Sequence, residues 1–401
     1  MTGTIIAQII SIAISPILTR IYSPLDYGLF ALYVSLGSII SVVASGRYEL
    51  SVMLPPKDEN AVNIVALSFV MTFTVSILTL LCVWAFNSEI SKMLESEAIS
   101  NWLYLIPVTV LLTGIYQTLN YWSNRKKQYR RVAVSRISMS ITTAGVFLGM
   151  GFARMGASGF LVGSILGQSV ATGLLGYQGW KEDKKYRKYI RKKEIIQYFK
   201  QYKDFLIFNS PTALLNSISQ SLPIFIMSSS FDSSTVGLYS MSVRVIYWPL
   251  NLISSSVEQV FFQKVAEKYR DGEPLKPQLF KIALTFALIY FFPVIILTLF
   301  GIDLFAFVFG EQWREAGKFS QILVIPFAFK SIVSPLTMAI PAAGKIKLGS
   351  FWHVLYFITI SITLFLASKL RIESFLIIFG IHELVLYTIY FGLTLVAIRT
   401  K

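Results

Sequence analysis

Seven charged side chains lie within, or at the ends of, strongly apolar stretches of this sequence. They are Arg47, Glu49, Arg136, Arg244, Glu258, Lys330 and Glu383. A charged side chain at the centre of a bilayer costs about 2.5 to 3.5 kcal/mol, so each needs a partner or a role. Cations that face a water-filled route would attract an anionic group such as a phosphate. The four cations are therefore candidate substrate-binding residues, and the three glutamates are candidate ion-coupling residues.

Each charge also has a structural explanation. Arg47, Arg136 and Glu258 lie near predicted helix ends, from which a long side chain can reach the membrane surface. Arg244 and Lys330 lie deeper. Each of these two either faces an aqueous cavity or forms a buried pair with one of the glutamates, and the sequence leaves both alternatives open.

Spacing limits which of these residues can meet. Arg47 and Glu49 are two positions apart, about 200° around a helix, so we expect them to have different partners. His382 and Glu383 are adjacent and point about 100° apart, so they do not form a ready-made dyad. As a metal site that pair is weak, whereas Glu383 alone suits proton coupling.

Amide side chains form a polar stripe in one predicted helix. Asn209, Asn216 and Gln220 share a helical face because they are seven and four positions apart. Amides both donate and accept hydrogen bonds, which suits sugar hydroxyls, so these three are further candidate substrate-binding residues. The alternative is that they hold neighbouring helices together.

The elements that must position these residues are membrane helices. Hydrophobic residues make up 54% of the 401 residues and charged residues only 14%, and the mean hydropathy is +0.62. Soluble proteins have about a quarter charged residues. The sequence predicts an all-α integral membrane protein with about 12 transmembrane helices. The predicted spans cover residues 3–19, 27–46, 61–86, 100–121, 132–153, 157–180, 205–230, 237–262, 279–300, 317–341, 348–368 and 374–398.

Lysine and arginine set the expected orientation. They are concentrated in the predicted gaps that follow even-numbered spans and at the C-terminus. By the positive-inside rule, both termini are cytoplasmic, as an even number of spans requires. The net charge of +15 then reflects topology and attraction to anionic membrane lipid, and we expect no nucleic-acid partner.

A polar segment divides the spans into six and six. Residues 181–204 carry ten basic and four acidic side chains with apolar residues interleaved. We expect an N-terminal six-helix lobe at 1–180, a basic amphipathic linker on the cytoplasmic leaflet at 181–204, and a C-terminal six-helix lobe at 205–401. The alternative for the linker is a solvated spacer.

An internal repeat relates the two halves. Residues 26–34 (DYGLFALYV) resemble residues 235–243 (TVGLYSMSV), 209 positions later, and the same offset aligns Glu49 with Glu258. Since each half contains an even number of helices, the halves would have parallel orientation around a central cavity, related by a pseudo-two-fold axis along the membrane normal. The cations do not match, because Arg47 aligns with Ser256.

Several classes of function are excluded by missing motifs. Cys82 is the lone cysteine, so the sequence has no internal disulfide and no cysteine metal cluster. The sequence contains no G-x-x-x-x-G-K-S/T phosphate loop, which excludes a built-in ATP motor of that type.

Two segments carry a resemblance to a known family. LTRIYSPLDYGLFALYVSLGSIISVVASGRYELSVMLP, followed by KDENAVNIVALS, resembles the N-terminal part of bacterial Wzx-type lipid-linked oligosaccharide flippases. VGLYSMSVRVIYWPLNLISSSVEQVFFQKVAE resembles their eighth helix and the following loop. These flippases belong to the multidrug/oligosaccharidyl-lipid/polysaccharide (MOP) exporter superfamily. The chain departs from them at its start, which lacks their usual short basic stretch before the first helix.

The resemblance implies a transporter rather than an enzyme, without a cofactor. It implies translocation of undecaprenyl-pyrophosphate-linked O-antigen or capsule repeat units across the bacterial inner membrane by alternating access, coupled to H+ or Na+. Lipid-linked oligosaccharide, membrane lipid and other polysaccharide-assembly membrane proteins are the implied partners. The alternatives are a drug/cation antiporter of the same superfamily, which predicts acidic dominance in the cavity, and a membrane glycosyltransferase, which predicts a large periplasmic loop.

Overall fold

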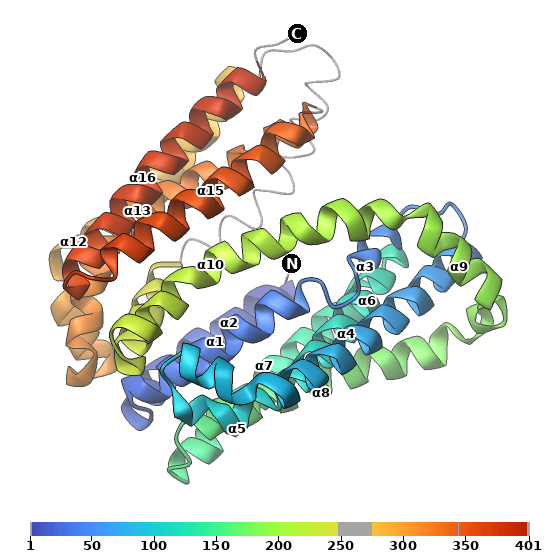
Figure 1. Ribbon diagram of the computed structural model, residues 1–401, viewed down its shortest axis with the longest axis horizontal. Coiled ribbons are helices and arrows are strands. Elements are labelled where there is room, and N and C mark those ends of the chain that lie inside the picture. Colours follow the sequence, from blue (N-terminus) through green and yellow to red (C-terminus); the bar gives the residue numbers. More distant parts are fainter. Residues whose placement is uncertain (1, 248–274, 344, 399–401) are drawn as a thin grey trace. The chain divides into compact units, whose positions relative to one another are not determined.

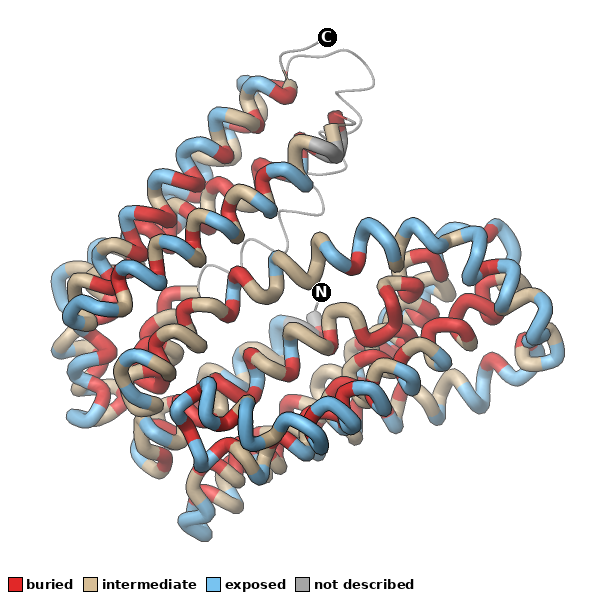
Figure 2. The backbone as a smooth tube through the Cα atoms, viewed as in Figure 1, coloured by how far each residue is buried: buried red, intermediate tan, exposed pale blue. Residues whose placement is uncertain are grey.

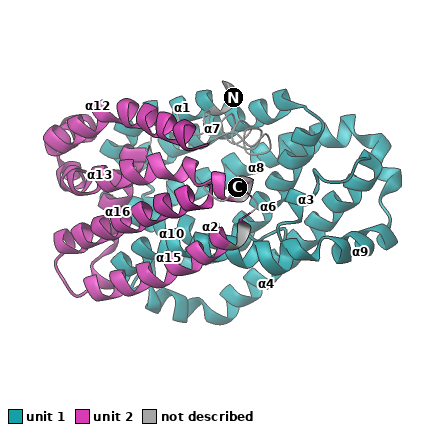
Figure 3. Cartoon of the chain, turned by 90° about the horizontal axis from the view of Figure 1, so that it is seen from above, with its two compact units in different colours: residues 1–229 teal, residues 230–401 magenta. Residues whose placement is uncertain are grey.

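The computed structural model describes residues 2–247, 275–343 and 345–398, and the regular structure within these ranges is helical (Figure 1). Packing divides the chain into two compact units, unit 1 at Met1–Ser229 and unit 2 at Ser230–Lys401 (Figure 3). Many of the helices alternate buried and exposed faces (Figure 2). Each unit therefore has a helical core of its own.

Unit 1 is a bundle of long helices joined by short turns. Its elements are α1 (Thr2–Ile21), α2 (Pro24–Ser41), α3 (Tyr48–Ser51), α4 (Asp58–Met93), η1 (Glu97–Ile99), α5 (Ser100–Leu103), α6 (Ile106–Arg125), α7 (Tyr129–Phe152), α8 (Ala157–Glu182), η2 (Lys184–Tyr189), α9 (Lys192–Gln201), η3 (Phe205–Asn209) and α10 (Ser210–Ser230). Helix α7 packs along α8 and α1, and α4 packs along α6. The ring of Phe160 stacks on Tyr22 with centroids 4.0 Å apart and meets Phe147 edge-to-face with centroids 4.8 Å apart, so aromatic contacts join the end of α1 to α7 and α8.

The helix that carries the first repeated segment starts with a capping box. Ser23 accepts a hydrogen bond from the backbone N–H of Asp26 at 3.3 Å, and the Asp26 carboxylate accepts one from the N–H of Ser23 at 2.9 Å. In unit 2, Asp232 accepts a hydrogen bond from the N–H of Thr235 at 2.6 Å, before the helix that includes residues 233–247. Residues 23 and 232 differ by the offset of the repeat, so both repeated segments begin with a side-chain cap.

The basic linker folds onto unit 1. Tyr186 of η2 and Tyr198 of α9 are buried in an apolar cluster with Trp122 and residues of α3 and α4. The lysines of α9 remain exposed. The structure therefore shows an amphipathic helix packed on the bundle rather than a solvated spacer, and its position on the cytoplasmic leaflet stays a prediction.

Unit 2 is a smaller bundle in the described part of the chain. Besides the helix that includes residues 233–247, its elements are α12 (Lys276–Phe309), η4 (Glu311–Trp313), α13 (Arg314–Leu336), α14 (Ala339–Ala342), α15 (Ile346–Ala367) and α16 (Ile372–Ala397). Helix α13 packs against both α12 and α16, and α15 packs along α16. Helix α13 is therefore enclosed on several sides, which brings its polar residues into the interior.

The predicted spans correspond to helices, but not all are equally apolar. Among the described residues, eight helices are long and apolar enough to cross a membrane. A ninth span is the pair Glu97–Leu103 and Ile106–Arg125, which is bent by 50°. Three of the twelve predicted spans fall outside this count, for separate reasons. The first predicted span forms a shorter apolar helix, Ile5–Ile21. The seventh predicted span forms η3 and the polar helix α10, and the eighth extends beyond the described residues.

The division into lobes differs in one respect from the expected domains. The compact units separate at residues 229 and 230, so α10 is grouped with unit 1, whereas the sequence suggested a lobe that starts at residue 205. The hydroxyl of Ser228, near the end of α10, donates a hydrogen bond to the carbonyl of Leu94 at 2.7 Å. The six-plus-six division stays a prediction.

Candidate functional site

A left-handed turn separates α2 from α3 in unit 1. Gly46 and Arg47 both have φ of 62°. A Cβ atom on Gly46 would lie 3.2 Å from Leu206, Met71 and Tyr48, so the packing as well as the backbone favours glycine there. A non-glycine residue such as Arg47 rarely adopts this conformation, and strain of this kind is found mostly where the fold fixes a functional side chain.

The turn brings Arg47 and Glu49 together, contrary to the sequence expectation. Arg47 Nη1 lies 3.5 Å from Glu49 Oε1, and Arg47 Nε donates a hydrogen bond to Asn209 Oδ1 at 2.9 Å. The expectation was wrong because it placed both residues on one regular helix, whereas Arg47 precedes α3 with left-handed φ. The Arg47 side chain is 23% exposed, so its charge still meets solvent.

Glu49 is the buried member of this group. It is 1% exposed and accepts a hydrogen bond from the Ser45 hydroxyl. Burial raises the pKa of the Glu49 carboxyl above its usual range, while the Ser45 hydrogen bond and the Arg47 charge oppose that shift. Arg47, Glu49 and Asn209, hereafter the Arg47 cluster, thus combine one half-exposed cation, one buried carboxylate and one amide.

The amide stripe is exposed. Asn209, at the end of the π-helical turn η3, and Asn216 and Gln220 on α10 are all exposed, whereas Ser219 and Ser221 of the same helix are buried. A helix that exposes its amides while it buries some of its hydroxyls has a polar face that needs water or another polar partner. The predicted stripe therefore continues from the Arg47 cluster along α10.

A separate pocket of about 220 Å³ opens in unit 1. It lies between α2, α6 and α8 and is lined by Tyr33, Val34, Gly37, Ser38, Ser41, Thr109, Leu112, Thr113, Ser164, Ile165 and Gln168. The lining has hydroxyl and amide groups but no Asp, Glu, Lys or Arg. The Tyr33 and Thr109 hydroxyls share a hydrogen bond of 2.6 Å, while the buried Ser41 hydroxyl has no hydrogen-bond partner among the described residues. The pocket suits a neutral ligand.

In unit 2 the candidate residues Lys330 and Glu383 pair with each other. Lys330 Nζ lies 2.8 Å from Glu383 Oε2, and the Tyr356 hydroxyl donates to Glu383 Oε1 at 2.5 Å. His382 Nδ1 lies 3.6 Å from Glu383 Oε1. Of the two alternatives for Lys330, the structure therefore shows the buried pair, formed between α13 and α16.

Arg136 and Arg244 lie on two further helices, one in each unit. Arg136 is half-buried on α7. Arg244 is half-buried in the helix that includes residues 233–247, and no ion pair with another described residue involves it. Glu258 lies outside the described residues.

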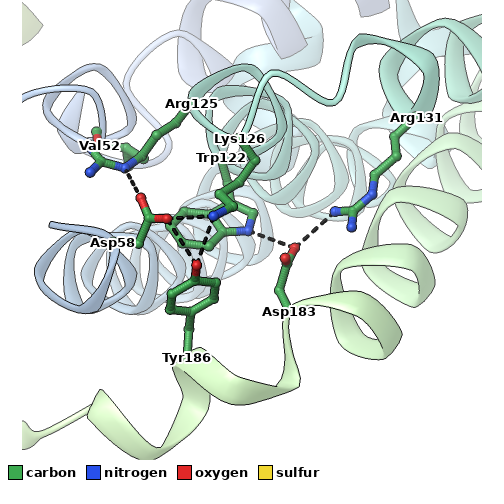
Figure 4. A network of polar contacts seen from close by, with 8 residues as sticks. All are labelled: Val52, Asp58, Trp122, Arg125, Lys126, Arg131, Asp183 and Tyr186. Atoms are coloured by element: carbon green, nitrogen blue, oxygen red, sulfur yellow. Dashed lines mark hydrogen bonds and ion pairs between the residues drawn. The ribbon is translucent and has the colours of Figure 1, made fainter.

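Sequence reasoning missed a polar network at one end of unit 1 (Figure 4). Asp58 accepts hydrogen bonds from Arg125 at 2.9 Å, from Lys126 at 2.5 Å and from the Tyr186 hydroxyl at 3.0 Å. Asp183 accepts hydrogen bonds from Trp122 at 3.0 Å and Arg131 at 2.9 Å. A signal was present for Asp183, which interrupts a basic run at the end of α8, whereas Asp58 has only Lys57 beside it at the start of α4. The network fixes η2 to α4, α6 and α7.

Comparison with known proteins connects this architecture to polysaccharide synthesis. Residues 17–318 match the model of a family described as polysaccharide biosynthesis protein. The chain belongs to this family. One relative is an "Uncharacterized membrane protein in cps region" of Klebsiella pneumoniae, 24% identical over 86% of this chain and 72% of the relative. Another is the "Teichuronic acid biosynthesis protein TuaB" of Bacillus subtilis (strain 168), 21% identical over 42% of this chain and 35% of the relative.

Solved structures identify the fold of this family member. The lipid II flippase MurJ in an inward closed conformation has a TM-score of 0.70 at 13% identity, over 98% of this chain and 86% of MurJ. An inward-facing multidrug resistance MATE transporter of the MOP superfamily has a TM-score of 0.67 at 14% identity, over 99% and 94%. The MATE transporter ClbM, solved in complex with Rb+, has a TM-score of 0.57 at 15% identity, over 100% and 91%.

These findings confirm the predicted class. The protein is an all-helical, multi-pass membrane protein of a polysaccharide biosynthesis family, and it has the fold of the MurJ and MATE structures.

Proposed function

We propose that this protein is a flippase that moves undecaprenyl-pyrophosphate-linked oligosaccharide repeat units, of O-antigen or capsule, from the cytoplasmic to the periplasmic leaflet of the inner membrane. The observation that carries the proposal is the half-exposed Arg47 guanidinium beside an exposed row of amides. The family membership and the MOP-type fold supply the polysaccharide context.

The Arg47 cluster suits a pyrophosphate. A guanidinium can bind phosphate oxygens through two parallel hydrogen bonds, and such charge-assisted bonds are short and strong. Glu49 and Asn209 hold the guanidinium in a fixed orientation without covering it. The headgroup would therefore meet a preorganised cation, while the polyprenyl tail stays in lipid.

The neutral polar surfaces of unit 1 suit the sugars. Moving an oligosaccharide through hydrocarbon would leave many hydroxyls without hydrogen bonds. Asn216 and Gln220 of α10 offer exposed hydrogen-bond donors and acceptors. A route lined with such groups lowers the cost of transfer.

Transport would proceed by alternating access of the two lobes, driven by an ion gradient or the membrane potential. Moving one elementary charge across the membrane changes its free energy by about 2.3 kcal/mol per 100 mV of membrane potential. Glu49 is the candidate proton carrier in unit 1, because burial favours its protonated form and Arg47, which would hold the substrate, lies next to it. Protonation of Glu49 would remove the carboxylate that pairs with Arg47, and so would favour binding of the substrate's phosphate to the guanidinium.

The drug/cation antiporter alternative has less support. It requires a carboxylate that a cationic drug can reach. Glu49 is 1% exposed and Glu383 is 0% exposed, and each already contacts a cation of its own unit. The exposed charge of the Arg47 cluster is positive, which favours an anionic substrate.

The proposal is tested with Arg47→Ala in proteoliposomes that contain a labelled lipid-linked oligosaccharide, by following the loss of label accessible from one side. Losing a hydrogen bond to a charged group costs about 1.5 to 3 kcal/mol, so we expect translocation to fall about 10- to 100-fold. Arg47→Lys keeps the charge but not the paired donors, and an intermediate rate is expected.

Arg130→Ala is the matched control, because Arg130 is an exposed arginine at the start of α7. It should translocate at the wild-type rate. Equal rates for Arg47→Ala and wild type, at equal amounts of folded protein, would rule out the proposed headgroup site. Failure of the wild-type gene to restore surface polysaccharide in a strain lacking its own flippase would count against the function itself.

A further inference from the structure

The Lys330–Glu383 pair of unit 2 has the surroundings of a cation-binding site. Glu383 is 0% exposed, and the Lys330 side chain is 11% exposed. The carboxylate receives the Tyr356 hydroxyl, and His382 Nε2 lies 3.1 Å from the Thr359 hydroxyl. A buried carboxylate with an ordered phenol beside it is a set of oxygen ligands for a small cation.

Aromatic rings surround the ammonium on its other sides. Lys330 Nζ lies 5.1 Å from the ring centroid of Tyr387, 5.7 Å from that of Tyr356 and 6.0 Å from that of Phe327. These distances are within the range in which a ring attracts a cation, and the attraction is larger where water is excluded. We call Glu383 and these three rings the Lys330 cage.

A second aromatic layer closes this region. Trp352 stacks on Tyr390 with centroids 4.2 Å apart and planes 9° apart, and Trp352 also contacts Tyr356 and Tyr387. Trp352 is 2% exposed. The layer limits access of water to the cage, so a charge inside depends on its protein partners.

We propose that the Lys330 cage is a monovalent-cation site that the chain fills with its own side chain, so that no alkali-metal ion binds at Glu383 in the native protein. One carboxylate balances one cation. A metal ion added there would set two positive charges against a single negative one in a closed apolar cage. Any metal-ion coupling of transport must then use other residues, and this holds whichever substrate the protein carries.

The test replaces the tethered ammonium with a free one. In Lys330→Ala, propylammonium supplies three carbons and an ammonium group, which match the Cγ, Cδ, Cε and Nζ atoms that the substitution removes. The full chain is melted in detergent with and without this ion. We expect Lys330→Ala to melt well below wild type, and propylammonium to restore roughly half or more of the lost melting temperature by mass action. Rb+ and Na+ should restore less.

Three controls separate the cage from general salt effects. Lys330→Ala combined with Glu383→Gln removes the carboxylate and should not respond to propylammonium. Lys318→Ala breaks an exposed pair, in which Lys318 and Glu373 lie 2.9 Å apart with side chains 48% and 36% exposed, and should not respond either. Propylammonium, Na+ and Rb+ should each change the melting temperature of wild type by no more than they change that of Glu383→Gln.

Two results would overturn the proposal. One is stabilisation of wild type by Na+ or Rb+ that Glu383→Gln abolishes, because the carboxylate would then bind a metal ion despite Lys330. The other is a Lys330→Ala protein that propylammonium neither stabilises nor helps to recover during solubilisation. The readouts are melting temperature and recovery of protein, so they stand apart from any failure of the flippase proposal in a transport assay.

Discussion

The Arg47 cluster of unit 1 and the Lys330 cage of unit 2 hold the same kind of charges in opposite ways. Each contains one cation and one buried carboxylate. In unit 1, a left-handed turn presents the cation to solvent and an amide helps to hold it. In unit 2, two regular helices carry the charges and aromatic rings enclose them. The Arg47 charge is therefore available to a ligand, whereas the Lys330 charge is already neutralised by Glu383.

The scaffolds around these charges are more alike than the charges themselves. Gly28 and Leu29 of α2 are buried, as are Gly237 and Leu238 at the equivalent positions of the second repeat. The repeat thus preserves which face of the helix packs into its own unit. Function would then differ between the units through a few polar substitutions on a shared framework.

The largest expected effect comes from leaving a buried charge unpaired in unit 2. Glu383→Gln strands the Lys330 ammonium, and breaking a buried pair in this way costs about 3 to 5 kcal/mol. The equivalent change in unit 1, Glu49→Gln, should cost about 1 kcal/mol, because Arg47 keeps solvent and Asn209 as partners. Thermal melting of the two purified variants in detergent measures the contrast.

The double variant Lys330→Met with Glu383→Gln is the control for the larger effect. It removes both charges and retains apolar volume, so most of the lost stability should return. Equal melting temperatures for Glu383→Gln and Glu49→Gln would contradict the distinction between the enclosed Lys330–Glu383 pair and the solvent-exposed Arg47–Glu49 pair.

The sequence predicted the framework better than the pairing. Long apolar stretches were enough to place most of the membrane helices, because hydrophobic length is a local property. The Arg47–Glu49 contact could not be predicted, since it depends on two consecutive left-handed residues that a helical projection does not contain. Lys330 was left with two alternatives, and only the packing of α13 on α16 chose between them.

The turn that presents Arg47 is the source of the next effect in size. Gly46→Ala forces a side chain onto a residue with φ of 62° and places its Cβ 3.2 Å from Leu206, Met71 and Tyr48. We expect a loss of about 1 to 3 kcal/mol in stability. Translocation should also fall, because the change displaces the neighbouring guanidinium.

Gly145→Ala is the matched control for Gly46→Ala. Gly145 lies within α7, and its added Cβ would meet no heavy atom within 4 Å. A helical glycine replaced by alanine gains about 0.5 to 1 kcal/mol, so this variant should melt at or above the wild-type temperature. Wild-type stability for Gly46→Ala would show that the turn does not need glycine.

The smallest effect tests whether the repeat equates the two units at the level of single hydrogen bonds. Ser23→Ala and Asp232→Ala each remove a side chain that accepts a hydrogen bond from a backbone N–H in the first turn of a repeated helix. Loss of such a cap costs about 1 kcal/mol.

Asp204→Ala is the control, because Asp204 precedes η3 and makes no capping hydrogen bond through its side chain. Similar melting-temperature losses for the two cap variants, with none for the control, would support equivalent helix starts. A loss confined to Ser23→Ala would mean that the two segments share a sequence pattern without sharing its energetics.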